Sequence, residues 1–330
     1  MDKKTLIKTL KIIAPILFGA FLIWITFNNA TPKEIADVIS YIKEANYSWV
    51  IISVTLGLLS HLSRAYRWKF TLEPLGYKPK FINSFMAVMI AYFANLGIPR
   101  SGEILRATTL TTYEGIPFEK AFGTIIAERI ADLIMSMIFV FIALAFQYDM
   151  IIDAVNPVFI SIRTKITENP TSLFLALALI SIIASTGWFV LRKTNNPILR
   201  KIKNFFIGLK DGVLSIVTMK KKWAFIFHTI FIWTMYFLMF YVIFFSVKET
   251  INTPISTAIV AFVTGSFTMA VTNGGLGSFP LVIQETLNLF NISNQSGLAI
   301  GWIMWGSQTL LNIVFGVISF FYLPIYNRTK

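Results

Sequence analysis

Stretches of about twenty apolar residues recur along this chain and decide what it can fold into. A transmembrane helix needs ~20 such residues, and six stretches qualify, at about 10–28, 47–68, 120–147, 172–191, 223–247 and 297–324. No polar interval between them is long enough for a separate soluble domain. Lipid cannot satisfy backbone amides, so the spans must be helical. The sequence predicts an all-α polytopic membrane protein, a single transmembrane domain over residues 1–330.

The chain has few charged residues, and most of them are basic. Charged residues make up 14% of the sequence, against about 25% in soluble domains, and the net charge is +13. The basic residues flank apolar stretches, as topology signals beside anionic headgroups do. No nucleic-acid-binding motif accompanies them, so nucleic acid is not an expected partner. Cysteine is absent and the two histidines, His61 and His228, are not spaced as a ligand pair, so neither a metal nor another cofactor is expected.

Two further apolar regions are interrupted by helix-breaking residues. Region 81–113 is broken around Gly97, Pro99 and Gly102, and region 255–290 is broken by three glycines and a proline within 272–280. Glycine and proline end helices. Each region is predicted to form a hairpin of two half-helices.

The distribution of basic residues predicts how these hairpins sit in the membrane. If both are re-entrant, entering and leaving on one side, twenty Lys and Arg residues of the loops and termini face the cytoplasm and five face outward. If both crossed fully, the loop at 192–222 with its nine basic residues would lie outside, against the positive-inside rule. We therefore expect six spanning helices plus two re-entrant hairpins, with both termini on the cytoplasmic side of the inner membrane.

This topology divides the chain into two units of opposite orientation. Residues 47–147 form the first unit around hairpin 81–113, and residues 223–324 form the second around hairpin 255–290. Apolar residues at helical spacing in 192–222 predict a cytoplasmic amphipathic linker between them. Inverted repeats whose broken helices meet near mid-membrane are a recurring transporter plan.

The first hairpin carries the densest group of candidate site residues. A helix break inside a membrane is tolerated where it lines a cavity, and the N-terminus of the second half-helix favours anions such as phosphate. Glu103 and Arg106 share a helix face, and arginine can bind phosphate through two hydrogen bonds. The alternative is an ion pair that only holds the hairpin. The predicted substrate-binding residues here are Asn95, Pro99, Arg100, Gly102, Glu103 and Arg106.

Residues 128–132 form a second charged group, in the third predicted span. Glu128 and Asp132 lie four apart on one helix face, and Arg129 reaches Asp132 three positions on. One arginine between two acids leaves a surplus carboxylate that burial would push toward protonation. These residues are candidates for gating or proton coupling, and a static salt-bridge lock against the hairpin's arginines is the equal alternative.

Two weaker groups complete the candidates. Arg64 and Arg67 are expected to snorkel to the membrane interface and anchor the helix there. A direct contact with a lipid headgroup is the less favoured alternative. In the second hairpin the glycines permit close backbone approach to a ligand. The residues assigned there are Asn273, Gly274, Gly275 and Gly277 for substrate binding, and Glu285 for coupling.

Residues 95–106 and 128–132, and more weakly 64–68, resemble the lysylphosphatidylglycerol synthase transmembrane-region family, whose membrane domain is flippase-like. Asn273 and Pro280 depart from that family's usual second-hairpin pattern, Pro-Gly-Gly-x-Gly followed closely by Glu. The resemblance implies the membrane domain standing alone, without the aminoacyl-transfer domain.

The function expected is translocation of an anionic lipid, a phospholipid or a polyprenyl phosphate, between leaflets. No soluble-enzyme signature such as a P-loop or a zinc-protease motif occurs, so catalysis is not expected. The alternatives are a membrane enzyme or enzyme subunit acting on a lipid-linked substrate, with Glu103 as base, and a non-transporting partner of a membrane enzyme.

Overall fold

The computed structural model describes residues 17–168 and 207–328, except positions 18–19, 25, 27, 29, 99, 209, 212–213 and 273. Between 149 and 168 it describes only the side chains of Asn156 and Ile160. The predicted spans at 10–28 and 172–191, and most of the linker at 192–222, lie outside the described residues. The described elements are all helical.

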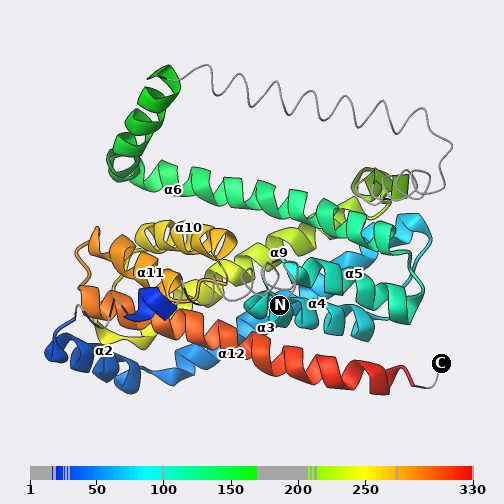
Figure 1. Ribbon diagram of the computed structural model, residues 1–330, viewed down its shortest axis with the longest axis horizontal. Coiled ribbons are helices and arrows are strands. Elements are labelled where there is room, and N and C mark those ends of the chain that lie inside the picture. Colours follow the sequence, from blue (N-terminus) through cyan, green and yellow to red (C-terminus); the bar gives the residue numbers. More distant parts are fainter. Residues whose placement is uncertain are drawn as a thin grey trace, which may run out of the picture.

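Four long helices run along the long axis of the molecule (Figure 1). They are α3 (Tyr47–Leu72), α6 (Phe118–Glu168), α9 (Lys222–Tyr241) and α12 (Asn294–Tyr326). Phe118–Tyr148, Lys222–Ser246 and Asn294–Tyr326 are each long and apolar enough to cross a membrane, and α3 adds a fourth candidate together with the helix before it. Within α6 the backbone of Gln147 is non-helical, and the helix changes direction there. The prediction of several membrane-spanning helices is confirmed at this level.

An amphipathic helix, α2 (Pro32–Glu44), precedes α3 and was not predicted. It meets α3 at a bend of 72° and packs Val38 against Leu298 and Ala299 of α12. A capping box between Thr31 and Glu34 begins it. The signature S/T-x-x-E in the sequence is the signal that could have revealed this helix.

The first predicted hairpin is present as α4 (Phe81–Gly97) and α5 (Ser101–Glu114). The turn places Arg100 at a φ of 62°, a conformation that costs a bulky residue energy. Asn95 closes the turn, because its Oδ1 accepts a hydrogen bond of 2.7 Å from the Gly102 amide. A Cβ at Gly102 would collide with the backbone oxygen of Ala91. Glycine therefore lets the start of α5 lie directly against α4.

The second predicted hairpin is present as α10 (Ile255–Val271) and α11 (Ser278–Asn288). Gly274, Gly275 and Gly277 all have positive φ values, between 63° and 73°. A Cβ at Gly275 would come within 2.5 Å of Met269 Sδ and 2.8 Å of Phe279 Cβ. These glycines are explained by the turn and by packing between the two half-helices.

The two hairpins approach each other from opposite ends of the bundle (Figure 1). Their tips meet, since a Cβ at Gly274 would lie 3.6 Å from Leu96 Cδ2. The largest apolar core surrounds the second hairpin with α9 and α12, and a separate core joins α3, α4, α5 and α6 around Trp68. The short 3-10 helices Glu73–Leu75 (η1), Val242–Ser246 (η2) and Lys248–Thr250 (η3) lie in the connections. The first hairpin is thus held directly beside α3 and α6, which carry the charged residues described next.

Candidate functional site

Charged residues from three helices meet inside the bundle in one cluster, which we call the arginine cluster. Its members are Arg64 and Arg67 of α3, Glu103 and Arg106 of α5, and Glu128, Arg129 and Asp132 of α6. They lie on neighbouring turns of their helices, so each helix presents its charges on one face. Residues predicted as three separate groups therefore belong to one site.

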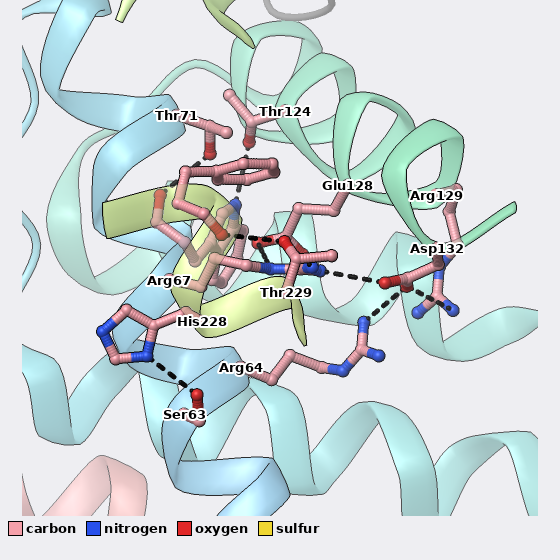
Figure 2. Close-up of polar contacts among 12 residues, drawn as sticks. Ser63, Arg64, Arg67, Thr71, Thr124, Glu128, Arg129, Asp132, His228 and Thr229 are labelled. Atoms are coloured by element: carbon pink, nitrogen blue, oxygen red, sulfur yellow. Dashed lines mark hydrogen bonds and ion pairs between the residues drawn. The ribbon is translucent and has the colours of Figure 1, made fainter. Parts of the chain in front are cut away.

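Asp132 connects α3 with α6 (Figure 2). One carboxylate oxygen lies 2.8 Å from Arg64 Nη1, and the other lies 3.2 Å from Arg67 Nη2. Arg67 also donates a hydrogen bond of 2.8 Å to Thr229 of α9. Arg64 is 2% exposed and Arg67 is fully buried. The prediction that these two arginines snorkel to the interface is wrong, because both are held inward by a buried acid.

Arg106 connects the first hairpin to α6. Its Nη1 lies 2.8 Å from Oε2 of Glu128, which is fully buried. The Arg106 guanidinium also stacks on the Trp68 ring at 3.8 Å from the centroid, and the Trp68 Nε1 donates to Thr124 of α6 at 2.8 Å. Glu103, although on the same helix face, is not the partner of Arg106. The alternative prediction of a lock between the hairpin and α6 matches this contact.

Glu103 and Arg129 form the exposed edge of the arginine cluster. Arg129 Nη2 lies 3.8 Å from Glu103 Oε1, and Arg129 Nη1 lies 3.6 Å from Asp132 Oδ2. The Arg129 side chain is 47% exposed and that of Glu103 is 25% exposed. Long ion pairs of this kind contribute little, about 0–1 kcal/mol. The edge between α5 and α6 is therefore the weakest connection of the cluster.

The charge balance of the cluster is the reverse of the one predicted. Four arginines, at 64, 67, 106 and 129, face three carboxylates, at 103, 128 and 132, which leaves one net positive charge. Both acids of the 128–132 group have arginine partners from other helices. The predicted surplus of acid is wrong, because arginines distant in sequence meet these acids in space.

A small cavity adjoins the cluster, and two of the arginines that line it have side-chain nitrogens without a hydrogen-bond partner among the described residues. Residues lining it include Arg64, Tyr92, Asn95, Glu103, Arg106 and Arg129. Arg106 is only 3% exposed, and its Nε and Nη2 have no hydrogen-bond partner among the described residues. The cavity volume of about 20 Å³ holds one water molecule and not a phosphate. A buried guanidinium with free donors, beside net positive charge, favours an anion if the cavity widens.

The break of the first hairpin contributes less than predicted. Two amides at the start of α5 already have acceptors: that of Gly102 donates to Asn95, and that of Ser101 to the Ile98 carbonyl at 3.2 Å. Arg100 is exposed and is not among the residues that line the cavity. Pro99 lies outside the described residues. Among these candidates, Asn95, Glu103 and Arg106 lie at the cavity, and Gly102 supports its wall.

Among its described residues, the second hairpin contributes none to the ion pairs of the arginine cluster or to the lining of its cavity. The Gly274 carbonyl accepts a hydrogen bond of 2.8 Å from Trp305 Nε1 of α12, and Glu285 is exposed on α11 with a 3.4 Å hydrogen bond from its neighbour Gln284. Asn273 lies outside the described residues. The structure thus brings the residues of 64–67, 95–106 and 128–132 together, while the second hairpin meets the first at its tip, where Gly274 lies beside Leu96.

Several polar side chains around the cluster were not predicted. Tyr92 lines the cavity and its hydroxyl lies 2.9 Å from that of Tyr236 on α9. Thr124 and Thr229 accept the hydrogen bonds of Trp68 and Arg67. Single Tyr and Thr residues in apolar helices carry no sequence pattern that marks them as partners. Among the described residues no group of His, Asp and Glu could hold a metal ion.

Comparison with known proteins gives one family and two partial relatives. The chain is 32% identical over 120 residues to a UPF0104 membrane protein of Methanocaldococcus jannaschii, which covers 34% of this chain and 36% of that protein. It is 29% identical over 100 residues to Glycosyltransferase AglD of Haloferax volcanii, which covers 30% of this chain and 16% of that protein. The matches thus span about a third or less of either relative. No solved structure matches the chain.

The family match covers far more of the chain. The family described as "Lysylphosphatidylglycerol synthase TM region" matches residues 12–316, a range that contains both hairpins and every member of the arginine cluster. By this match the chain belongs to the lysylphosphatidylglycerol synthase transmembrane-region family.

Proposed function

We propose that this chain is a lipid translocase that moves an anionic phospholipid or a polyprenyl-phosphate lipid between the leaflets of the cytoplasmic membrane. One observation carries the proposal: Arg106, a buried residue that lines the cavity of the arginine cluster, has two guanidinium nitrogens without a hydrogen-bond partner among the described residues. Buried charge within a membrane is costly and is generally retained for function. Family membership supports a membrane role and leaves the transported lipid open.

The charge of the cluster suits a phosphate headgroup. Its single net positive charge matches the single negative charge of a phosphodiester, and arginine can bind such a group through two parallel hydrogen bonds. Arg106 already uses Nη1 for Glu128, so Nε and Nη2 remain for the ligand. Arg64, which also lines the cavity, has an unpartnered Nε among the described residues. Bound phosphate would complete the charge balance of the site.

Access requires the site to open. With room for about one water, the cavity is occluded. The pair of Glu103 and Arg129 closes it at the exposed edge between α5 and α6, and little free energy opposes its separation. Beside this edge, Ile130, Leu133 and Ile134 are about half exposed on α6. We infer that the headgroup enters by this edge while the acyl chains stay in lipid.

We infer further that the chain has six spans and two re-entrant hairpins in an inverted repeat, with both termini in the cytoplasm. The meeting of the hairpin tips, Leu96 with Gly274, supports this arrangement. It would let each hairpin form one half of a path across the membrane. The site beside the first hairpin would then load from the inner leaflet.

Translocation in vesicles tests the proposal. Purified protein is reconstituted with phosphatidylglycerol that carries a fluorophore on one acyl chain, and dithionite quenches the label in the outer leaflet. We expect protein-dependent exchange that Arg106→Lys reduces at least tenfold, because lysine keeps the charge beside Glu128 but cannot bind a phosphate through two parallel hydrogen bonds. Arg328→Lys, a change at an exposed arginine outside the cluster, is the matched control.

A second lipid and a second variant sharpen the test. Polyprenyl phosphate as competitor separates the two lipid classes, because the preferred one slows exchange of the other. Glu103→Gln should also abolish exchange while leaving folded protein, since the edge between α5 and α6 then loses the ion pair that would close the cavity over a bound headgroup. Wild-type exchange by both Arg106→Lys and Glu103→Gln would overturn the assignment of this site.

One observation favours a second candidate, a membrane subunit of an enzyme that acts on a lipid-linked substrate. A partial relative is named a glycosyltransferase. Mass spectrometry of the same vesicles, supplied with nucleotide-activated sugars, distinguishes the candidates. A new lipid species would favour the enzyme subunit, and exchange without a new species favours the translocase. The third candidate, a non-transporting partner protein, predicts neither.

A further inference from the structure

A second recess opens at the end of the bundle that holds α2 and the η3–α10 connection, on the left in Figure 1. Three segments form it: the bend of α6 at Gln147, residues 249–257 leading into α10, and residues 289–292 between α11 and α12. Apolar packing of Ala143, Ile259 and Val260 holds α6 against α10 beneath it. The recess is therefore supported by rigid helices on two sides.

The recess has the size of a small-molecule site. Its volume is about 420 Å³, within the range of roughly 300–1,000 Å³ for ligand pockets. It is about twenty times larger than the cavity at the arginine cluster. A ring of monosaccharide size fits it without rearrangement of the helices.

The recess has a mixed lining, in which most residues are polar and none is basic. Side-chain amides, hydroxyls and one carboxylate are contributed by Gln147, Glu249, Asn252, Thr253, Ser256 and Asn291, among others. None of the lining residues is Lys, Arg or His, so a phosphate would meet no cation and one negative charge there. The arginine cluster and this recess consequently select ligands of different chemistry.

Amides and hydroxyls both donate and accept hydrogen bonds, as the hydroxyls of a sugar or polyol also do. The carboxylate of Glu249 can accept from two adjacent hydroxyls. Phe290 and Pro254 supply apolar surface in the same recess, which suits the C–H face of a sugar ring. The combination of neutral polar groups with an aromatic face is a match for a polyhydroxylated ligand.

Two lining residues have notable local geometry. Thr253 is 8% exposed, and its hydroxyl has no hydrogen-bond partner among the described residues. Asn291 is held at a φ of 62°, with its amide nitrogen bonded to the Asn288 carbonyl at 3.0 Å. Asparagine adopts this conformation readily after a helix end, so the turn fixes where its side chain begins.

We propose that this recess binds a neutral polyhydroxylated group, a sugar or a polyol, independently of the arginine cluster. The proposal does not rest on lipid translocation, because it uses none of the residues assigned to it. On the inferred topology the recess faces the outside of the cell. Its occupant is a free saccharide or the glycan headgroup of a lipid, two sources that share one chemistry.

Saturation-transfer NMR on the purified protein tests this. The protein is held in a detergent without sugar, such as an amine oxide, because maltoside headgroups would occupy the recess. The probes are methyl glycosides of glucose, mannose and galactose, with inorganic phosphate as a competitor. We expect saturation transfer to at least one glycoside, unaffected by phosphate. A glycosyl diacylglycerol in nanodiscs, compared with the free glycoside, distinguishes the two sources.

Variants locate the binding. Asn291→Gly keeps the positive φ and removes only the amide, and Asn252→Ala removes a second amide. Each should weaken glycoside binding about fivefold to tenfold, the effect of one lost hydrogen bond. Asn288→Ala, at an exposed asparagine one turn away that does not line the recess, should bind normally. The proposal is overturned if no glycoside receives saturation, if both lining variants bind as the wild type does, or if phosphate displaces the sugar.

Discussion

The ion pair between Arg106 and Glu128 provides the sharpest test of how the first hairpin is held. Replacing Arg106 with Gln leaves the carboxylate of Glu128 in a fully buried position without its 2.8 Å partner. Arg67 Nε is the other cationic group near this carboxylate, and at 3.9 Å it is too distant for a hydrogen bond. Removing one partner of a buried pair costs about 3–5 kcal/mol. Arg106→Gln should lower the free energy of unfolding by about that amount.

The double variant Arg106→Gln with Glu128→Gln measures the interaction between the two residues separately from the contribution that each residue makes alone. Without a charge at either position, no carboxylate is left uncompensated, and the two amides can bond to each other. We expect the double variant to recover all but about 1–2 kcal/mol of the loss, because replacing a buried pair by neutral groups is often close to neutral. Glu128→Gln alone leaves the buried Arg106 charge unpaired and should also cost about 3–5 kcal/mol, so the coupling energy from the cycle should be at least about 4 kcal/mol in magnitude.

Unfolding by sodium dodecyl sulfate in mixed micelles, followed by tryptophan fluorescence, supplies the four free energies. Arg106→Lys belongs in the same series. It keeps a cation beside Glu128 but loses the stacking on Trp68, worth about 1 kcal/mol, so it should stay folded while losing transport. A loss below about 1 kcal/mol for Arg106→Gln, with no coupling to Glu128, would refute the conclusion that this pair holds the hairpin.

Three further predictions follow from the structure. Asp132→Asn should lower stability by about 3–5 kcal/mol in the same assay, because Arg64 and Arg67 lose their shared carboxylate; transport per folded molecule should keep its pH dependence, and loss of that dependence would restore proton coupling through Asp132. Gly102→Ala should reduce the yield of folded protein on size exclusion, because the new methyl group meets α4; wild-type yield would contradict the packing. In this cysteine-free chain, Lys78→Cys should react with an impermeant maleimide only from the cytoplasm and Lys248→Cys only from outside, and the opposite pattern would contradict the topology.

The helices and their breaks were predictable from the sequence because they depend on local properties. Apolar length marks the spans, and the residues around Gly97 and Gly102 mark the end of one half-helix and the start of the next. The predicted hairpins at 81–113 and 255–290 correspond to α4 with α5 and α10 with α11. The chain also belongs to the family that residues 95–106 and 128–132 indicated.

The candidate site was only half predictable. Arg106, Glu128 and Asp132 were recognised because a charged residue within an apolar helix is energetically costly and is usually paired or functional. Two pairs were assigned from sequence neighbours, Glu103 with Arg106 and Arg129 with Asp132, and only the second is present, at 3.6 Å. The equal alternative, a lock between these acids and an arginine of the hairpin, matches the contact of Arg106 with Glu128. The stronger contacts join residues 22 and 68 positions apart.

What the sequence determined by itself was therefore the class of the protein, the positions of its helix breaks and the presence of buried charge that needs a partner. Hydrophobicity, glycine and proline act on the helix that contains them, so their effects can be predicted from one contiguous stretch of sequence. What only the tertiary structure decided was which charges pair, that the whole cluster carries one net positive charge, and that two nitrogens of Arg106 have no hydrogen-bond partner among the described residues. Those properties depend on how α3, α5 and α6 pack, because a guanidinium bonds to whichever carboxylate the neighbouring helix places within about 3 Å of it.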